Sequence, residues 1–107
     1  MEIRLLESAK EDLKSGYRFY ELQSAGLGEY FLNSVQGDVK SLCIYAGVHA
    51  LTDGFYRMLA KRFPFAVYYL TERDAVNIYA IIGCRRDPNW ISSRLASVRK
   101  RGGGPVS

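Results

Sequence analysis

The chain has few of the residues that metal sites and disulfide frameworks require. Its 107 residues include two cysteines, Cys43 and Cys84, and one histidine, His49. Two widely spaced cysteines do not make a disulfide framework or a zinc site, so we expect buried free thiols in a reducing cytoplasm. His49 has no partners at the spacing of a catalytic triad. We therefore expect no metal and no cofactor.

Long apolar runs are also absent. No segment reaches the length of a membrane-spanning helix, and no charged start precedes an apolar segment as in a signal peptide. A chain of 107 residues has room for one core. We expect a single domain over residues 1–98, a basic, glycine-rich disordered tail over residues 99–107, and no membrane association.

The two halves of the chain differ in charge: the first half has few basic residues and the second half has few acidic ones. Residues 1–54 hold five Lys or Arg and eight Asp or Glu, a net charge of −3. Residues 55–107 hold ten Lys or Arg and three Asp or Glu, a net charge of +7. A one-sided basic surface favours anionic partners, such as nucleic acid or an acidic protein segment. The alternative is that these charges only solvate a small basic protein.

The first half of the sequence predicts a short strand and a helical hairpin. Residues 2–6 form the strand. Ser8 fits the N-cap of the first helix, and a glutamate three residues later completes a capping box. A second helix, over residues 27–46, carries apolar residues at steps of three and four until Gly47 ends it. Because only Ala25-Gly26 links them, the two helices should be antiparallel neighbours.

Three apolar runs in the second half predict an antiparallel sheet, over residues 55–61, 65–71 and 75–84. In the last run Ile81 interrupts the alternation, so this strand should be central. Its even-numbered residues from 76 to 82 should share one face, and its odd-numbered residues the other. The fold class is then α+β, of order β-α-α-β-β-β(-α), with the helical hairpin packed on a small antiparallel twisted sheet. The opposite sheet face should be partly open.

Asp87-Pro88 predicts the N-cap and first residue of a final helix that runs to about Val98. Just before it, Arg85 and Arg86 follow the last strand, where guanidinium groups can bind phosphate or carboxylate. As neighbours, they should point to different sides. The alternative for Arg85 is an ion pair with Asp87 or with a carboxylate of the helical hairpin.

Further basic and aromatic side chains are candidates for contacting a partner. Arg57 and Lys61 have the even spacing that would place them on one strand face. The other candidates are Arg62, Tyr68, Trp90 and Arg94. Structural roles remain open for each of these: strand solvation for the lysine and Arg62, core packing for the tyrosine, packing of the final helix onto the sheet for the tryptophan, and a solvated basic end for Arg94.

The order of these elements resembles the RelE/ParE superfamily of bacterial type II toxins. The residues that carry the resemblance are Tyr56-Arg57, Phe63-Pro64-Phe65, Val67-Tyr68-Tyr69, Ile78 to Ile82, Arg85, Pro88 and Trp90. The resemblance implies a growth-inhibiting toxin of the plasmid-stabilising kind. It also implies a cognate antitoxin with a segment that folds around the toxin, and contact with operator DNA only through that antitoxin.

The resemblance leaves two targets open. In the RelE branch, which cleaves messenger RNA on the ribosome, an arginine at the place of Arg85 stabilises charge on the phosphate, and lysines near Lys61 assist. That branch also has a second arginine where this chain has Phe65 or Ala66, and a tyrosine near Trp90. Tryptophan can act neither as a base nor as a useful acid. The departure favours the ParE branch, which inhibits DNA gyrase, over an endoribonuclease.

Overall fold

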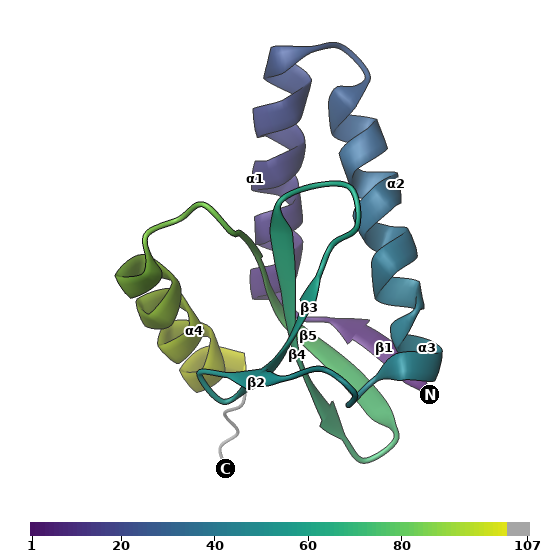
Figure 1. Cartoon of the computed structure of the whole chain (residues 1–107), viewed down its shortest axis with the longest axis vertical. Helices are drawn as coiled ribbons and strands as arrows, with labels where there is room; N and C mark the ends of the chain where they lie inside the picture. Colours follow the sequence, from purple (N-terminus) through teal and green to yellow (C-terminus); the bar gives the residue numbers. More distant parts are fainter. Residues whose placement is uncertain (103–107) are drawn as a thin grey trace.

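The computed structural model of the chain describes residues 1–102 and has an α+β fold (Figure 1). In chain order the elements are β1 (Glu2–Leu5), α1 (Glu7–Gln23), α2 (Leu27–Lys40), α3 (Leu42–Tyr45), β2 (Leu51–Thr52), β3 (Phe55–Leu59), β4 (Phe65–Glu72), β5 (Ala75–Gly83) and α4 (Pro88–Gly102). The strand order in the sheet is β1-β5-β4-β3-β2. This confirms the predicted fold class and the order of the main elements.

The sheet is mixed. β1 runs parallel to β5, whereas β2, β3, β4 and β5 pair antiparallel with their neighbours. The sequence predicted only antiparallel pairing, because a first strand separated by a helical hairpin gives no local signal of its partner. The short α3 and β2 were not predicted. β5 lies between β1 and β4 and is buried on both faces, as Ile81 indicated.

The helical hairpin closes through a side chain. The Glu21 carboxylate accepts hydrogen bonds from the backbone N–H groups of Gly26 and Gly28, at 2.9 Å each. Gly26 has φ of 89°, a left-handed conformation that glycine adopts without strain. Farther from the link, the Phe31 ring of α2 packs where Gly16 of α1 has no side chain. The predicted antiparallel hairpin is confirmed.

The predicted capping box is wrong. α1 begins at Glu7, and its N-cap residue Leu6 makes no side-chain capping bond. Ser8 is buried, and its hydroxyl donates to the carbonyl of Tyr79 at 2.6 Å. Because Ser8 faces β5, its hydroxyl satisfies a buried carbonyl of the sheet instead of the helix terminus.

The second helix is also shorter than predicted, and ends at Lys40. The Ser41 hydroxyl donates to the carbonyl of Asp38 at 2.6 Å, a local bond of the kind that competes with the helical ladder. The predicted apolar stripe therefore continues into the separate turn α3. Gly47 follows α3 with φ of 92°, a left-handed conformation that glycine adopts without strain.

The sheet separates two apolar cores. The core under the helical hairpin is built mainly from Ala9, Leu13, Phe31, Val35, Val39, Leu42, Met58, Val67, Tyr69, Val76, Ile78 and Ile81. The second core lies on the opposite face, where α4 contributes Leu95 and Val98 against Phe55, Ala66, Tyr68, Tyr79, Ala80 and Ile82. The expectation that this face is partly open is therefore wrong: α4 covers it.

A β-bulge in β5 changes which residues share a face. Tyr68 pairs with Ala80 and Tyr69 with Ile78, so Tyr79 is an extra residue without a direct partner. Tyr79 and Ala80 both face the α4 core, and Ile81 then faces the hairpin core. The predicted alternation is correct up to Tyr79 and wrong beyond it.

The last predicted boundary also moves. α4 continues to Gly102, so the first residues of the predicted tail are helical. Arg99 donates to the carbonyl of Gly54 at 3.0 Å and lies over the Phe55 ring at 5.2 Å, which ties this turn to the start of β3. Residues 103–107 of the predicted tail lie outside the described residues.

The few cysteines differ from the expectation in one respect. Both are free, but Cys43 is exposed and Cys84 is half-buried, so the prediction of burial is wrong for Cys43. Within residues 1–102, no three His, Cys, Asp or Glu side chains come together in a way that could hold a metal ion. None of the helices in this range is long and apolar enough to cross a membrane.

Candidate functional site

A cleft of about 730 Å³ lies between α1, the end of β5 and the start of α4. It is lined by Glu11, Asp12, Ser15, Gly16, Phe19, Tyr20, Pro64, Phe65, Ile81, Ile82, Gly83, Arg85, Arg86, Trp90 and Arg94. Its walls therefore come from α1, the β3–β4 connection, the end of β5 with the turn after it, and α4. No short stretch of sequence contains the site.

The turn between β5 and α4 sets the orientation of the cleft. The N–H of Cys84 donates to the carbonyl of Pro64 at 2.8 Å, which holds the end of β5 against the β3–β4 connection. The Asp87 carboxylate accepts hydrogen bonds from the N–H groups of Asn89 and Trp90, at 3.0 and 3.2 Å. This is the N-cap that Asp87-Pro88 predicted.

Arg85 and Arg86 form the cationic side of the cleft. Both are exposed, and neither makes an ion pair with a carboxylate of the described residues. Because β5 ends at Gly83, the two residues lie in a turn, and both line the cleft instead of pointing to opposite sides. The alternative of an ion pair between Arg85 and Asp87 does not form, since the Asp87 carboxylate caps α4.

Exposed aromatic side chains also line the cleft. The Trp90 ring is 40% exposed and the Phe19 ring 58%. The guanidinium carbon of Arg86 lies 4.0 Å from the centre of the Trp90 ring, a cation–π arrangement that presents charge and ring together. Trp90 therefore lines the cleft, and Leu95 and Val98 pack α4 onto the sheet.

Tyr20 is a cleft residue that sequence reasoning missed. Its spacing along α1 is that of a core residue, and nothing in the neighbouring sequence indicates that it lines a cleft. Burial raises the pKa of Tyr20, and the nearby positive charge of Arg85 opposes the shift. The hydroxyl therefore stays protonated at neutral pH and can act as a hydrogen-bond donor.

Arg94 is engaged inside the protein. Its guanidinium pairs with the Asp12 carboxylate at 2.8 Å and donates to the carbonyl of Ser8 at 3.3 Å. The side chains of Arg94 and Asp12 are only 20% and 14% exposed. Asp12 also accepts the N–H of Ile81 at 2.9 Å. Arg94 thus joins α4 to α1 and closes the cleft floor, which differs from the solvated basic end considered as its alternative.

Arg57 and Tyr68 are brought together away from the cleft lining. The Arg57 Nε donates to the Tyr68 hydroxyl at 3.2 Å, and the terminal nitrogen lies 3.7 Å from Cys84 Sγ. Tyr68 is 2% exposed, so its ring packs in the α4 core and has no free face for a partner. Arg57 is half-buried.

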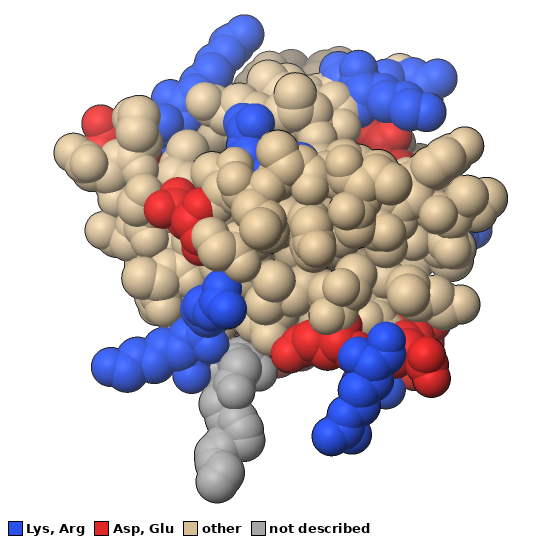
Figure 2. Space-filling model, turned by 60° about the horizontal axis from the view of Figure 1, so that its bottom comes forward, with Lys and Arg blue, Asp and Glu red and all other residues tan. Residues whose placement is uncertain are grey.

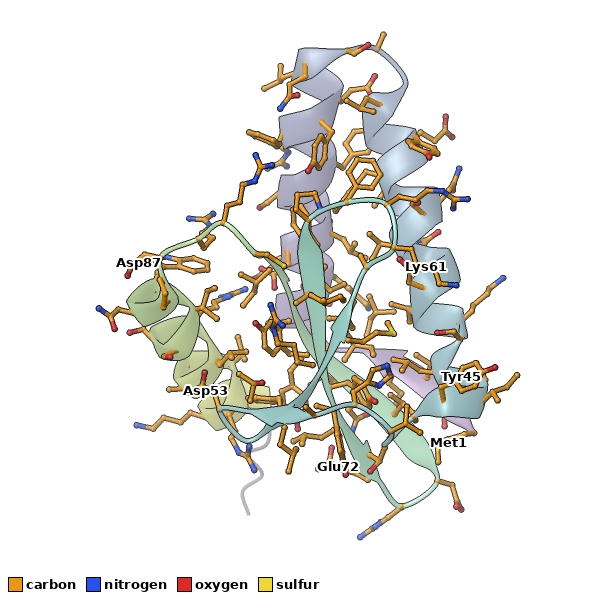
Figure 3. All side chains as sticks on the ribbon, in the orientation of Figure 1. Met1, Tyr45, Asp53, Lys61, Glu72 and Asp87 are labelled. Atoms are coloured by element: carbon orange, nitrogen blue, oxygen red, sulfur yellow. The ribbon has the colours of Figure 1, made fainter. Side chains whose placement is uncertain are left out.

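Lys61 and Arg62 lie in the exposed connection after β3, because that strand ends at Leu59. The prediction that Lys61 shares a strand face with Arg57 is therefore wrong. The backbone N–H of Lys61 donates to the buried Asp38 carboxylate of α2 at 3.0 Å. Figure 3 shows Lys61 beside α2 and Asp87 at the start of α4, on different sides of the sheet. The structure does not bring Lys61 to Arg85.

The fold that holds this cleft is of the RelE/ParE type. A solved structure described as "Chromosomal ParDE TA system from P. aeruginosa" contains a chain similar to this one, with a TM-score of 0.71. The two chains are 18% identical, and the match covers 78% of this chain and 95% of that chain. At this identity the likeness is one of fold, and it confirms the predicted RelE/ParE-like fold. No family model and no curated protein matches the sequence.

Proposed function

We propose that the chain is the toxin of a type II toxin–antitoxin pair, and that it acts in the ParE manner by binding and inhibiting DNA gyrase. A cognate antitoxin would neutralise it. The observation that carries this proposal is the cleft, in which Arg85 and Arg86 stand without carboxylate partners among the described residues beside an exposed tryptophan. Its setting in a ParE-like fold supports the same function.

The chemistry of the cleft suits binding to a macromolecule. A guanidinium is permanently charged and can meet two oxygens of a carboxylate or phosphate at once. Trp90 supplies the kind of large aromatic anchor on which interface energy concentrates. Gyrase bound to DNA offers both carboxylates and phosphates. An antitoxin segment with acidic and apolar residues would fill the same cleft and compete with the target.

A RelE-like ribonuclease is the second candidate, because Arg85 and Tyr20 line the same cleft. RNA cleavage through the 2′-hydroxyl needs a base, a charge stabiliser and an acid near one phosphate. Tyr20 has a raised pKa and could serve only as the acid. Lys61 does not line the cleft. The cleft therefore offers a stabiliser and a hydrogen-bond donor, a set that favours binding over cleavage.

A supercoiling assay with purified gyrase tests the proposal. We expect inhibition by the wild-type chain, and a loss of at least tenfold in potency for the Arg85→Ala/Arg86→Ala variant. Arg4→Ala is the matched control, because Arg4 is an exposed arginine on β1 whose ion pair with Glu2 is solvent-exposed and of little energetic weight. Its potency should equal that of the wild type.

The same preparations added to translating ribosomes separate the two candidates. Site-specific cleavage of the message that disappears in Arg85→Ala, together with unaffected supercoiling, would replace the gyrase proposal with the ribonuclease. If neither assay responds, and expression without an antitoxin leaves growth unchanged, the toxin proposal fails as a whole.

A further inference from the structure

A stretch of the chain distant from the cleft in sequence has no charged residue. Between Lys40 and Asp53 there is no Asp, Glu, Lys or Arg. Large apolar side chains of this stretch are nevertheless exposed: Ile44 by 79%, Tyr45 by 54%, Val48 by 70% and Leu51 by 64%. Single exposed apolar residues are ordinary, but a contiguous group of them marks an interaction surface.

These side chains belong to one short stretch of the chain, and the start of the chain lies next to that stretch. Met1 is 60% exposed, and its carbonyl lies 3.9 Å from the Sγ of Cys43 in α3. Figure 3 shows Met1 and Tyr45 at the same corner of the molecule, next to α3. In Figure 2 the centre of the face that carries this end of the molecule is broad and almost free of charge, with Lys, Arg, Asp and Glu mostly toward its rim. We call Met1, Ile44, Tyr45, Val48 and Leu51 the uncharged face.

The uncharged face is held in place by the sheet below it. The hydroxyl of the buried Tyr69 accepts the N–H of Gly47 at 2.9 Å and is hydrogen-bonded to the His49 ring. The N–H of Arg57 donates to the carbonyl of Ala50 at 3.0 Å. The segment that carries Val48 and Leu51 is thus anchored at three points. Its apolar side chains are exposed from a fixed backbone, which is the condition for binding without a large ordering cost.

We propose that two copies of this chain associate through the uncharged face. In a two-fold dimer each surface meets its own copy, so a surface with charge of one sign repels itself. The side of the cleft that carries Arg85 and Arg86 is poorly suited to meet its own copy for this reason. The uncharged face brings no like charges together, and it is therefore suited to self-association.

The free edge of the sheet also favours a second copy of this chain as the partner. β2 is the last strand in the order β1-β5-β4-β3-β2, so one of its two edges has no strand beside it. Leu51 and Thr52 of two copies can pair antiparallel across a two-fold axis and join the two sheets. Residues of these sizes and exposures present roughly 100 Å² each, so two copies would bury on the order of 1,000 Å², the size from which specific interfaces begin.

Sedimentation equilibrium of the purified full chain tests this inference. We expect a dimer at about 100 μM and a dissociation constant at least tenfold larger for Ile44→Lys and for Leu51→Lys. Leu22→Lys is the matched control: Leu22 is 89% exposed, lies in the last turn of α1 away from the uncharged face, and gains the same charge. The control should dimerise as the wild type does. Thermal melting at concentrations where the wild type is monomeric should give the same melting temperature for all three variants, because each position is exposed.

Two outcomes would overturn the inference. The first is a wild-type chain that stays monomeric at all concentrations, which would leave the uncharged face to a different protein or to a membrane surface. The second is a dimer that Ile44→Lys and Leu51→Lys leave intact, which would place the interface elsewhere. The inference does not depend on the proposed toxin function, since the measurement needs neither gyrase nor antitoxin.

Discussion

The ion pair between Arg94 and Asp12 provides a quantitative test of how α4 is held to the rest of the fold. Replacing Arg94 with alanine removes the partner of a carboxylate that is 14% exposed and leaves it with the N–H of Ile81 as a donor. Breaking a fully buried pair costs about 3–5 kcal/mol. Because water still reaches part of this site and the Ile81 bond remains, we expect a loss of roughly 2 kcal/mol in the free energy of unfolding at pH 7.

The cost should depend on pH in a defined direction. Folding raises the pKa of Asp12, because burial disfavours its charged form by more than the Ile81 N–H and Arg94 favour it. Loss of Arg94 raises this pKa further. A carboxyl with a raised folded-state pKa takes up its proton more readily in the folded state, so the folded state gains relative stability as the pH falls. The loss in unfolding free energy caused by Arg94→Ala is therefore greatest at neutral pH. It becomes smaller as the pH falls toward 3.8, the ordinary pKa of an aspartate.

Urea denaturation at a series of pH values measures this cost, and a thermal scan should show a melting temperature lower by about 8 °C at pH 7. Lys10→Ala is the matched control, since the Lys10–Glu7 pair is longer, at 3.6 Å, and largely exposed. That variant should change stability by less than about 0.5 kcal/mol. A cost for Arg94→Ala that is equal at pH 4 and pH 7 would refute the argument, because it would show that the charge of Asp12 does not matter.

Two further changes probe the packing of the hairpin and the uncharged face. A Cβ on Gly16 would lie 2.6 Å from ring atoms of the fully buried Phe31, so Gly16→Ala should lower the unfolding free energy by about 1–3 kcal/mol in urea denaturation. Gly37 has open space around it, so the control Gly37→Ala should raise the unfolding free energy by up to about 1 kcal/mol. Equal effects of the two substitutions would contradict this packing. Tyr69→Phe removes the acceptor of the Gly47 N–H and should cost about 1 kcal/mol, with faster hydrogen exchange at Gly47. Unchanged exchange would mean that the hydroxyl does not anchor the segment.

The elements that the sequence predicted well are those with a local signal. The apolar stripe of the hairpin helices, the three apolar runs and the cap at Asp87 each follow from residues a few positions apart, and all are present in the structure. The misplaced features depend on distant partners. The Ser8 hydroxyl donates to a carbonyl of β5 instead of capping α1, and β1 pairs in parallel with β5. Neither partner can be identified from adjacent residues.

The candidate site residues also divide into those with a local sequence signal and those that depend on distant parts of the fold. Arg85, Arg86 and Trp90 follow the last strand directly, and they line the cleft. Arg57 and Lys61 were placed by assuming a strand that continues to Lys61, and the strand ends at Leu59. Tyr20 was missed, because its spacing is that of a core residue and only the position of α4 turns its surroundings into a cleft.

The bulge at Tyr79 changes which residues of β5 lie on the face that α4 covers. A regular strand would alternate strictly, whereas the extra residue directs both Tyr79 and Ala80 toward the face opposite the hairpin. The Tyr79 ring and the small Ala80 form part of the surface on which Leu95 and Val98 of α4 pack. With α4 docked there, its first turn brings Trp90 alongside Arg86 and toward α1. The cleft therefore follows from the packing of α4 on this face, and the surface that we propose for recognition lies between α4 and α1.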